Sequence, residues 1–503
     1  MFRRALLPLL IITLHALSSS ADSAQTYDLV IAHGRVLDPE TQLDQTLNIG
    51  ISNGKIASLS REPLVGKHYI DAQGLLVAPG FIDLHSHAVT PTGQRYQLFD
   101  GVTTALELEA GAYPADRVGQ SLDSKALINY GGSLGYLWLR QWRLSDRYQA
   151  SLVHTVAEAE GRNPEWEALS PQSVFTESLS QKHISELQSA IKDEWRKGHS
   201  LGIGLPIDYL KFGLSDAELN AIFTTAAELD AIVFIHARRT PVGDLGGLNE
   251  LIELARTSGA AIHFCHLNSN ALKSISDYLE LIERVRVEGL DLSTEAYPYE
   301  AGSTQIGAAA FKGDWQTLYG MDFDDIVWVA TGERLTEASF HDYQHQTPEG
   351  YIVLFSNDMA SVDQAMLDSQ TIVASDAMPA PSDDAKVHPR GRGTFTRTLH
   401  RYVREQNALS WLDAIEKMTL LPARRLEHMA PSFARKGRIQ LGMDADIVAF
   451  DPNRVQDQAT YEDPDQPSVG MQYVLVNGSL IVRNGKLVED IYPGQRLRLI
   501  DPL

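Results

Sequence analysis

Strand-like and helical patterns alternate through most of this chain, and this alternation limits the possible folds more than any other feature. From residue 80 to residue 437, short apolar runs are separated by stretches of helical periodicity such as DAELNAIFTTAAEL. Such alternation is typical of parallel strands joined by helices. The number of repeats favours an α/β fold of the closed (β/α)₈ (TIM-like) type. The alternative is an open doubly wound sheet, which the absence of a G-x-G-x-x-G motif after any strand disfavours.

The candidate barrel strands are the most apolar runs of this region. They are FIDLHSH, TALELEAG, ALINYGGSLGY, LGIGLPIDY, IVFIHAR, AIHFCHLN, LDLSTEAYPY, YIVLFSN and TIVASDAM. Besides DAELNAIFTTAAEL, the candidate helices include LNELIELARTSG, SISDYLELIERVRVEG and WLDAIEKMTLLPARRL. The stretch 141–185 is rich in loop-forming residues, which predicts a lid or an insertion there.

The two ends of the chain share a different pattern. Residues 25–79 and 438–503 consist of short alternating runs broken by turn residues. Asn-Gly pairs at 53–54, 477–478 and 484–485 predict tight hairpins. We therefore predict that both ends build one small β-sandwich and that residues 80–437 form the barrel between them.

Residues 1–24 have the pattern of a secretory signal peptide. Arg3 and Arg4 precede the apolar run Ala5–Leu17, and the small residues of Ser19–Ala21 offer a cleavage site. The alternative is a membrane anchor, but the run is shorter than the roughly 20 residues that a bilayer span needs. We expect a secreted or periplasmic protein of bacterial type, with no stable membrane span after cleavage.

Charge and composition restrict the class of partner. With 43 Lys+Arg against 65 Asp+Glu, the formal charge is −22, which argues against nucleic acid because its phosphate backbone requires a basic surface. A hydrophobic fraction of 44% is ordinary for a globular protein and excludes disorder as the main class. The single cysteine, Cys265, excludes an internal disulfide and a Cys-rich zinc module. The oligomeric state stays open, a homo-oligomer included.

Residues of the types that bind metals end several predicted strands, and in a (β/α)₈ barrel these strand ends form the active site. Both pairs, His85 with His87 and Glu107 with Glu109, have period-two spacing, so the members of a pair point the same way. A carboxylate within an apolar strand is costly unless it is paired or binds a metal. The other such residues are His236, His266 and Asp376. Imidazole with carboxylate suits zinc, with one position left for water.

Longer motifs resemble a known family. PGFIDLHSH followed by GVTT resembles the metal-dependent amidohydrolase superfamily. EAYPYEAGST, SDAMP and HPRGRGTFTR resemble its N-acyl-D-amino-acid deacylase, or D-aminoacylase-like, branch, and GMDADIVAFDP resembles the return of the superfamily's chain into the sandwich. The resemblance covers nearly the whole mature chain. It implies a (β/α)₈ barrel with a sandwich built from both ends, and zinc-dependent hydrolysis of a linear amide, a C–N bond other than a peptide bond.

The resemblance also implies a role for each metal-binding type of residue. His85 and His87 would bind a buried zinc ion, and His236 and His266 would bind a second one. Asp376 would contact the nucleophilic water and act as general base and general acid. Zinc lowers the pKa of bound water to about 7, so a neighbouring carboxylate can take its proton and pass it to the leaving amine.

The implied substrate is a small amide that carries a carboxylate. Arginine binds carboxylates bidentately, and Arg390 occupies the matching position, with Tyr297 and Ser303 as hydroxyl partners. Arg392 and Arg238 are alternative cations. The acyl group, the amino acid and its stereochemistry stay open.

The chain departs from the branch pattern at two positions. Related deacylases carry a bridging cysteine on the second strand, near Ala110 of this chain. We predict that Glu109 provides the bridging oxygen, with Glu107 and a carboxylated Lys211 as alternatives. Asn268, at the substrate pocket, stands where branch members often have a lysine. This loss keeps cyclic amides, lactones, dipeptides and acyl-aminoacyl toxins open as substrates. A non-catalytic periplasmic binding protein is a further alternative.

Two residues near these motifs have structural interpretations. His263 lies within a predicted strand, so we expect a buried, hydrogen-bonded histidine. Cys265 precedes His266, and strand alternation predicts that its side chain points away from the metals as a small core residue.

Overall fold

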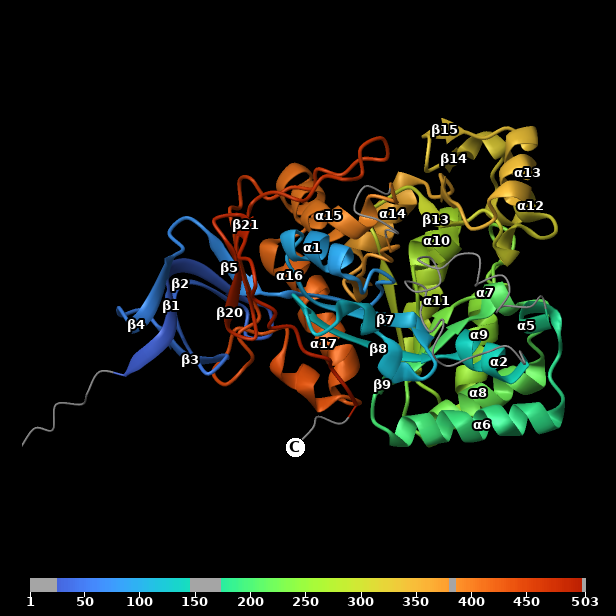
Figure 1. Ribbon diagram of the computed structural model, residues 1–503, viewed down its shortest axis with the longest axis horizontal. Helices are drawn as coiled ribbons and strands as arrows, with labels where there is room; N and C mark the ends of the chain where they lie inside the picture. Colours follow the sequence, from blue (N-terminus) through green and yellow to red (C-terminus); the bar gives the residue numbers. More distant parts are fainter. Residues whose placement is uncertain (1–24, 145–172, 380–385, 500–503) are drawn as a thin grey trace, which may run out of the picture.

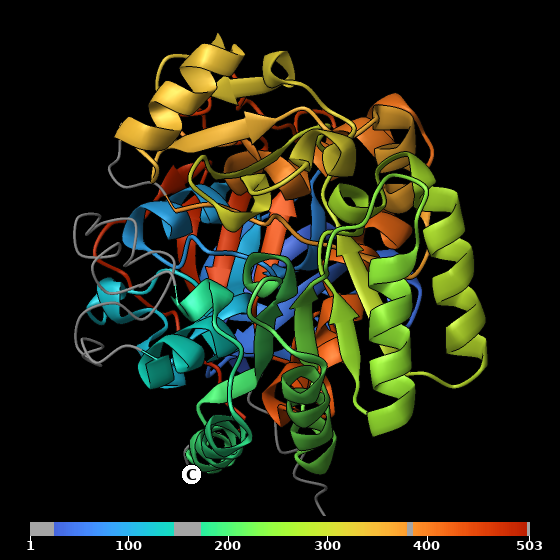
Figure 2. The same cartoon turned by 90° about the vertical axis from the view of Figure 1, so that its right-hand side faces the viewer.

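The computed structural model describes residues 25–144, 173–379 and 386–499 (Figures 1 and 2). The predicted signal peptide, residues 1–24, lies outside this part of the chain. So do residues 145–172, which are most of the stretch for which a lid was predicted. Among the described residues, no helix combines the length and the apolar character that crossing a bilayer requires.

Eight parallel strands form the barrel, in the order β17-β12-β11-β10-β9-β8-β7-β6. They are β6 (Phe81–Asp83), β7 (Val102–Ala112), β8 (Asn129–Gly135), β9 (Ser200–Pro206), β10 (Val233–His236), β11 (Ile262–Phe264), β12 (Leu292–Ala296) and β17 (Thr371–Val373). A parallel bridge between Ser86 and Ala377 joins the ends of β6 and β17 and closes the ring. The predicted (β/α)₈ fold is confirmed. All residues of β7 and β9 are buried, because side chains fill the barrel and helices cover it.

Three of the predicted helices surround the barrel as single helices: α8 (Asp216–Glu228), α9 (Gly246–Ser258) and α11 (Ile275–Val287). The fourth divides at Thr419 into α16 (Trp411–Met418) and α17 (Leu420–Glu427). Thr419 has a φ of −136° and Pro422 cannot donate a backbone hydrogen bond, so the helix restarts there. The other α-helices outside the insertion described below are α1 (Pro91–Phe99), α2 (Tyr136–Leu144), α5 (Ser173–Thr176), α6 (Gln181–Arg196), α7 (Ile207–Leu210), α10 (Leu267–Ala271), α14 (Met359–Leu367) and α15 (Arg390–Arg397).

One predicted barrel strand is wrong. YIVLFSN forms β16 (Tyr351–Leu354), which belongs to an antiparallel sheet of order β13-β16-β14-β15. With β13 (Gly302–Gln305), β14 (Ile326–Trp328), β15 (Glu333–Arg334), α12 (Trp315–Tyr319) and α13 (Glu337–Gln346), it forms an insertion between β12 and β17 (yellow in Figure 1). A short apolar run does not reveal which sheet it joins. The insertion has its own aromatic core, which includes Phe311, Trp315, Trp328 and Phe340.

The two chain ends form one nine-stranded sheet. Its strands are β1 (Thr26–Asp38), β2 (Leu43–Ser52), β3 (Lys55–Ser60), β4 (Val65–Asp71), β5 (Leu76–Pro79), β18 (Ile447–Phe450), β19 (Met471–Val476), β20 (Ser479–Arg483) and β21 (Lys486–Leu487). The ends meet where β5 pairs with β18 (left in Figure 1). Each predicted Asn-Gly turn joins two neighbouring strands, with positive φ at both residues as a type I′ turn requires.

Candidate metal centre and substrate cavity

Four histidines lie together at the carboxyl end of the barrel. His85 and His87 follow β6, His236 ends β10 and His266 follows β11. His266 and Asp376 have positive φ values of 34° and 51°, which are strained for residues other than glycine. Such strain is typical of functional sites, where the surrounding structure maintains it.

The first group consists of His85, His87 and Asp376. The Nε2 atoms of the two imidazoles lie 3.2 Å apart. Oδ1 of Asp376 lies 3.4 Å from Nε2 of His85 and 3.5 Å from Nε2 of His87. The three side chains thus present donor atoms within 4.8 Å of one another, close enough to share one ion.

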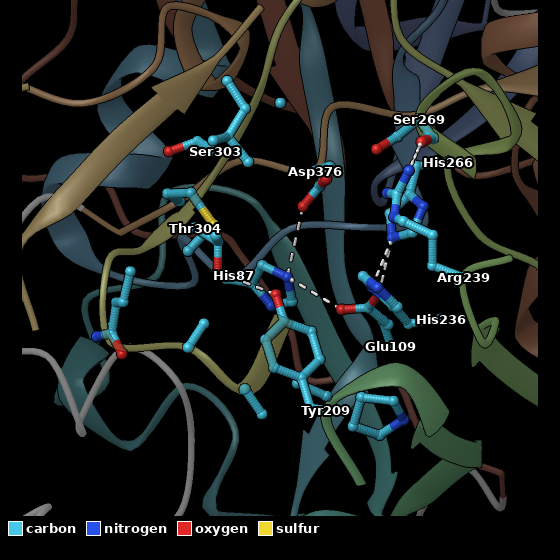
Figure 3. Close-up of a pocket in the computed structure, with 18 of the residues that line it drawn as sticks. His87, Glu109, Tyr209, His236, Arg239, His266, Ser269, Ser303, Thr304 and Asp376 are labelled. Carbon is cyan, nitrogen blue, oxygen red and sulfur yellow. Dashed lines mark hydrogen bonds and ion pairs between the residues drawn. The ribbon is translucent and has the colours of Figure 1, made fainter. Parts of the chain in front are cut away.

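The second group consists of His236, His266 and Glu109. Oε1 of Glu109 lies 2.9 Å from Nδ1 of His236 and 3.0 Å from Nε2 of His266. Its other oxygen, Oε2, lies 3.4 Å from Nε2 of both His85 and His87. Glu109 therefore lies between the two pairs of histidines (Figure 3 shows it with His87, His236 and His266).

The outer nitrogens of three imidazoles are held by acceptors. Nδ1 of His85 lies 2.5 Å from Glu295, and Nδ1 of His87 lies 2.9 Å from Glu107. Nδ1 of His266 lies 3.1 Å from Oδ1 of Asn270. Metal-binding histidines are usually oriented in this way, which leaves the lone pair of the other nitrogen for the metal. The convergence of these imidazole nitrogens with two carboxylates fits one or two zinc ions.

Of the three candidates for the bridging position, only Glu109 lies between the histidine pairs. Glu107 lies behind His87, where it also accepts a hydrogen bond from the backbone of Ala110 (3.3 Å). Lys211 lies 3.3 Å from Asp208 and does not line the cavity described below.

Glu295 is a buried residue that sequence reasoning missed. Its carboxylate contacts His85 on one side and Nε2 of His263 (3.0 Å) on the other, so it orients His85. A carboxylate in the apolar run LDLSTEAYPY was the signal that could have revealed it. The prediction for His263 is confirmed: the ring is fully buried, and its other nitrogen lies 2.7 Å from Ser293.

Cys265 is a buried core residue, as expected. Its Sγ lies in one group with atoms of His85 and Glu295, within 4.8 Å of one another. Strand β11 ends at Phe264, so the alternation of side chains does not extend to Cys265.

A cavity of about 460 Å³ lies above the histidines, within the size range of small-molecule sites. Residues of the barrel and of the insertion line it together, among them Tyr209 and Thr304, whose hydroxyls lie 3.0 Å apart (Figure 3). Three of the predicted substrate contacts, Tyr297, Ser303 and Arg390, also line it.

The prediction for Asn268 needs correction. The side chain is buried and does not line the cavity. Its amide donates to the backbone oxygen of Tyr297 (3.3 Å) and accepts from the backbone nitrogen of Tyr297 (3.4 Å). Asn268 therefore holds Tyr297 in place. Of the alternative cations, Arg238 pairs with Glu250 and Arg392 with Asp465, and neither lines the cavity.

Arg390 and Asp376 form a buried ion pair, in which Nη2 lies 3.0 Å from Oδ2. Burial alone would raise the pKa of Asp376, but the charges of Arg390 and His85 hold it below its ordinary value. Burial likewise raises the pKa of Glu109, and His85 and His236 more than offset it. Both carboxylates are therefore ionised at neutral pH, as metal binding and proton transfer require.

Comparisons with known proteins find similarity to amidohydrolases. A model of the amidohydrolase family matches residues 364–482. An N-acyl-D-glutamate deacylase of Alcaligenes xylosoxydans xylosoxydans is 29% identical, over 90% of this chain and 93% of the relative. A D-aminoacylase of the same organism is 26% identical, over 92% of this chain and 95% of the relative.

Solved structures of related enzymes are also similar to this chain. N-acyl-D-glutamate deacylase from Bordetella bronchiseptica, solved with zinc and a phosphonate inhibitor, has a TM-score of 0.75 and 25% identity. The similarity covers 94% of this chain and all of that one. A D-aminoacylase with 21% identity and a TM-score of 0.74, matched over 94% of this chain and 99% of its own, has the same fold. The chain is therefore similar along nearly its whole length to deacylases of N-acyl-D-amino acids, and its residues 364–482 match the amidohydrolase family.

Proposed function

We propose that this protein is a zinc-dependent hydrolase that removes the acyl group from N-acyl-D-amino acids. The observation that carries the proposal is the arrangement of two histidine pairs around Glu109, beneath a cavity that also presents Asp376 and Arg390. The likeness to deacylases along nearly the whole chain supports it.

Each group of side chains has a separate role in metal binding. His85, His87 and Asp376 would hold one ion, His236 and His266 would hold a second, and Glu109 would contact both. Zinc bound there supplies a Lewis acid for the amide carbonyl and lowers the pKa of water.

Asp376 is the residue that moves protons. Its ionised carboxylate accepts a proton from the attacking water and delivers it to the amide nitrogen as the C–N bond breaks. The products are a carboxylic acid and a free amino acid. Arg390 holds Oδ2 of Asp376, which leaves Oδ1 directed at His85 and His87.

The cavity wall differs in polarity from one side to the other, and this difference supports an orientation for the substrate. The residues that follow or end β7, β8 and β9 are mainly apolar, and those that follow β11, β12 and β17 are mainly polar. The apolar group includes Ala110, Leu137, Trp138, Phe175 and Pro206, and the polar group includes Ser269, Tyr297, Asp376 and Arg390. Strand order places the groups on opposite sides of the barrel. We therefore place the acyl chain on the apolar side and the carboxylate beside Arg390.

A substrate panel tests the proposal. The zinc-loaded enzyme would be assayed with N-acetyl-D- and N-acetyl-L-amino acids, dipeptides and cyclic amides. We expect turnover of the D-series, and none with the Asp376→Asn variant, which serves as the control for contaminating activity. Turnover of cyclic amides or dipeptides without any N-acyl-D-amino acid would overturn the proposal.

The sequence of residues 1–24 also supports export, and we propose a secreted or periplasmic location. The mass of the mature protein in its native host tests this. Loss of about 21–24 residues is the expected result for a cleaved signal peptide. A full-length chain in the cytoplasm would contradict the proposal.

A further inference from the structure

His388 is a fully buried histidine that the proposed mechanism does not use. It follows β17 in the chain and stands two residues before α15. Its ring packs edge-on against two tyrosines, with ring centres 5.4 Å from Tyr299 and 5.2 Å from Tyr461. It does not line the cavity, so any effect on the reaction passes through a neighbour.

Both ring nitrogens of His388 have backbone partners, and these partners assign the proton of the ring. Nδ1 lies 3.0 Å from the backbone nitrogen of Arg390, which can only donate, so Nδ1 is the acceptor. Nε2 lies 3.0 Å from the backbone oxygen of Ala301, which can only accept, so Nε2 carries the proton. Burial and the charge of Arg390 hold the pKa of His388 well below its ordinary value, which keeps the ring neutral, as both hydrogen bonds require.

The bond to Arg390 fixes the start of α15. The first backbone N–H groups of a helix have no partner within the helix, and an acceptor there determines where the helix begins. Arg390 is the first residue of α15, and its backbone oxygen accepts from the hydroxyl of Thr394 (2.8 Å). The backbone of Arg390 is thus held on both sides, and its Nη2 reaches Oδ2 of Asp376 at 3.0 Å from this fixed point.

The bond to Ala301 joins this helix start to the opposite wall of the cavity. Ala301 directly precedes β13 of the insertion, in which Gly302 and Ser303 line the cavity. One neutral ring therefore connects the segment that carries Arg390 to the first strand of the insertion.

We propose that His388 is a positioning residue of the hydrolase, whose ring holds the backbone of Arg390 so that the guanidinium meets Asp376. This inference rests on the proposed function and adds a residue that acts on the reaction only through Arg390. Loss of the ring leaves the N–H of Arg390 buried without a partner and frees the start of α15. A displacement of about 1 Å in a catalytic group can cost about 100-fold in rate.

The test is a double-mutant cycle between His388 and Arg390. Values of kcat and KM would be measured for the zinc-loaded wild type, His388→Ala, Arg390→Met and the double variant, with the N-acetyl-D-amino acid that the wild type hydrolyses fastest. We expect His388→Ala to lower kcat by about 10- to 100-fold with zinc content unchanged. In the Arg390→Met background the same change should cost about two-fold or less, because the residue through which His388 acts is already absent.

Two isosteric variants divide the contacts of the ring. In His388→Asn the amide oxygen takes the place of Nδ1 and accepts from Arg390, whereas in His388→Gln the amide nitrogen takes the place of Nε2 and donates to Ala301. We expect His388→Asn to keep most of kcat and His388→Gln to lose nearly as much as His388→Ala. Each variant keeps one buried hydrogen bond, so this comparison decides the matter even if His388→Ala folds poorly.

His400→Ala is the matched control. His400 lies in the segment that follows α15, where it contacts Asp457 and Glu405, and it does not line the cavity. This variant should keep the wild-type kcat.

Three results overturn the inference while the proposed function stands. One is a His388→Ala variant with the kcat of the wild type. The second is an equal loss in both backgrounds, which indicates only packing against Tyr299 and Tyr461. The third is a His388→Gln variant as active as His388→Asn. A wild-type enzyme that hydrolyses another amide and no N-acyl-D-amino acid overturns the proposed function alone, and the cycle is then measured with that amide. A wild-type enzyme inactive on all of these amides overturns both.

Discussion

Nη2 of Arg390 lies 3.0 Å from Oδ2 of Asp376, and both side chains are buried at the cavity floor. The guanidinium also covers the ring of Tyr297. Arg390 therefore has two tasks in the proposed reaction: it holds the carboxylate that moves the proton, and it provides the charge beside which the substrate's carboxylate lies.

Replacing Arg390 with Met should affect both tasks. We expect kcat/KM to fall by about 100-fold or more, with losses in kcat as well as KM. The Arg390 charge lowers the pKa of Asp376, so its loss raises that pKa. The acidic limb of the kcat/KM profile should therefore move to higher pH. Arg392→Met is the control, since Arg392 pairs with Asp465 and does not line the cavity. A change in KM alone, with kcat unchanged, would show that Arg390 does not position Asp376.

Asp376→Asn should separate proton transfer from metal binding. General acid–base catalysis typically contributes about 10²- to 10⁴-fold, so a loss in this range or beyond is expected in kcat. Asparagine keeps a side-chain oxygen beside the unchanged histidines and Glu109, so zinc should remain bound, as measured by elemental analysis. An active variant would show that another group takes the proton.

The two glutamates of β7 should behave differently. Glu109→Gln removes the charge between the histidine pairs, and we expect a lower zinc stoichiometry and loss of activity. Glu107→Gln only weakens the contact that orients His87. Loss of such an outer contact typically lowers metal affinity by about 10- to 100-fold. Saturating zinc should restore the Glu107 variant and not the Glu109 variant. The reverse order would assign the bridging position to Glu107.

Because of Lys417, the free energy of unfolding should depend on pH in the alkaline range. It is buried in α16, and burial lowers its pKa to about 8 from 10.5 in the unfolded chain. Between these values the unfolded state binds more protons, so stability rises with pH. Relative to Lys417→Met, the wild type should gain about 2 kcal/mol from pH 7 to pH 10 in urea unfolding. Lys486→Met, at an exposed position, should show no such gain. A pH-independent difference for Lys417→Met would mean that this lysine titrates normally.

Phe340 should be needed for the insertion and not for the barrel. It is buried among aromatic rings, with ring centres 5.5 Å from Trp315 and 5.3 Å from Phe323. A buried Phe→Ala change typically lowers the free energy of unfolding by about 3–5 kcal/mol. Phe340→Ala should therefore loosen the insertion and raise KM, while zinc stays bound. The comparison variant is Phe223→Ala in α8, which should lower the melting temperature of the barrel with KM unchanged. If KM were the same in both variants, the insertion would not contribute to substrate binding.

Local patterns in the sequence predicted most of the fold. The barrel strands, the helices and the three Asn-Gly hairpins follow from periodicity and turn chemistry, which act over a few residues. The error at β16 has the same origin, because a run of four apolar residues looks alike in a parallel and in an antiparallel sheet. The sequence pattern also predicts one helix across Thr419, although Pro422, which cannot donate a backbone hydrogen bond, indicates a break there.

The sequence by itself determined which residue types stand at the strand ends, and the four histidines, Glu109 and Asp376 meet there because parallel strands align their carboxyl ends at one edge. Only the tertiary structure decided what each neighbour does. It placed Glu295 behind His85, turned Asn268 onto the backbone of Tyr297 and joined the ring of His388 to the backbone of Ala301. These contacts join strands that are distant in the chain, and their geometry depends on backbone angles and packing that no local pattern encodes.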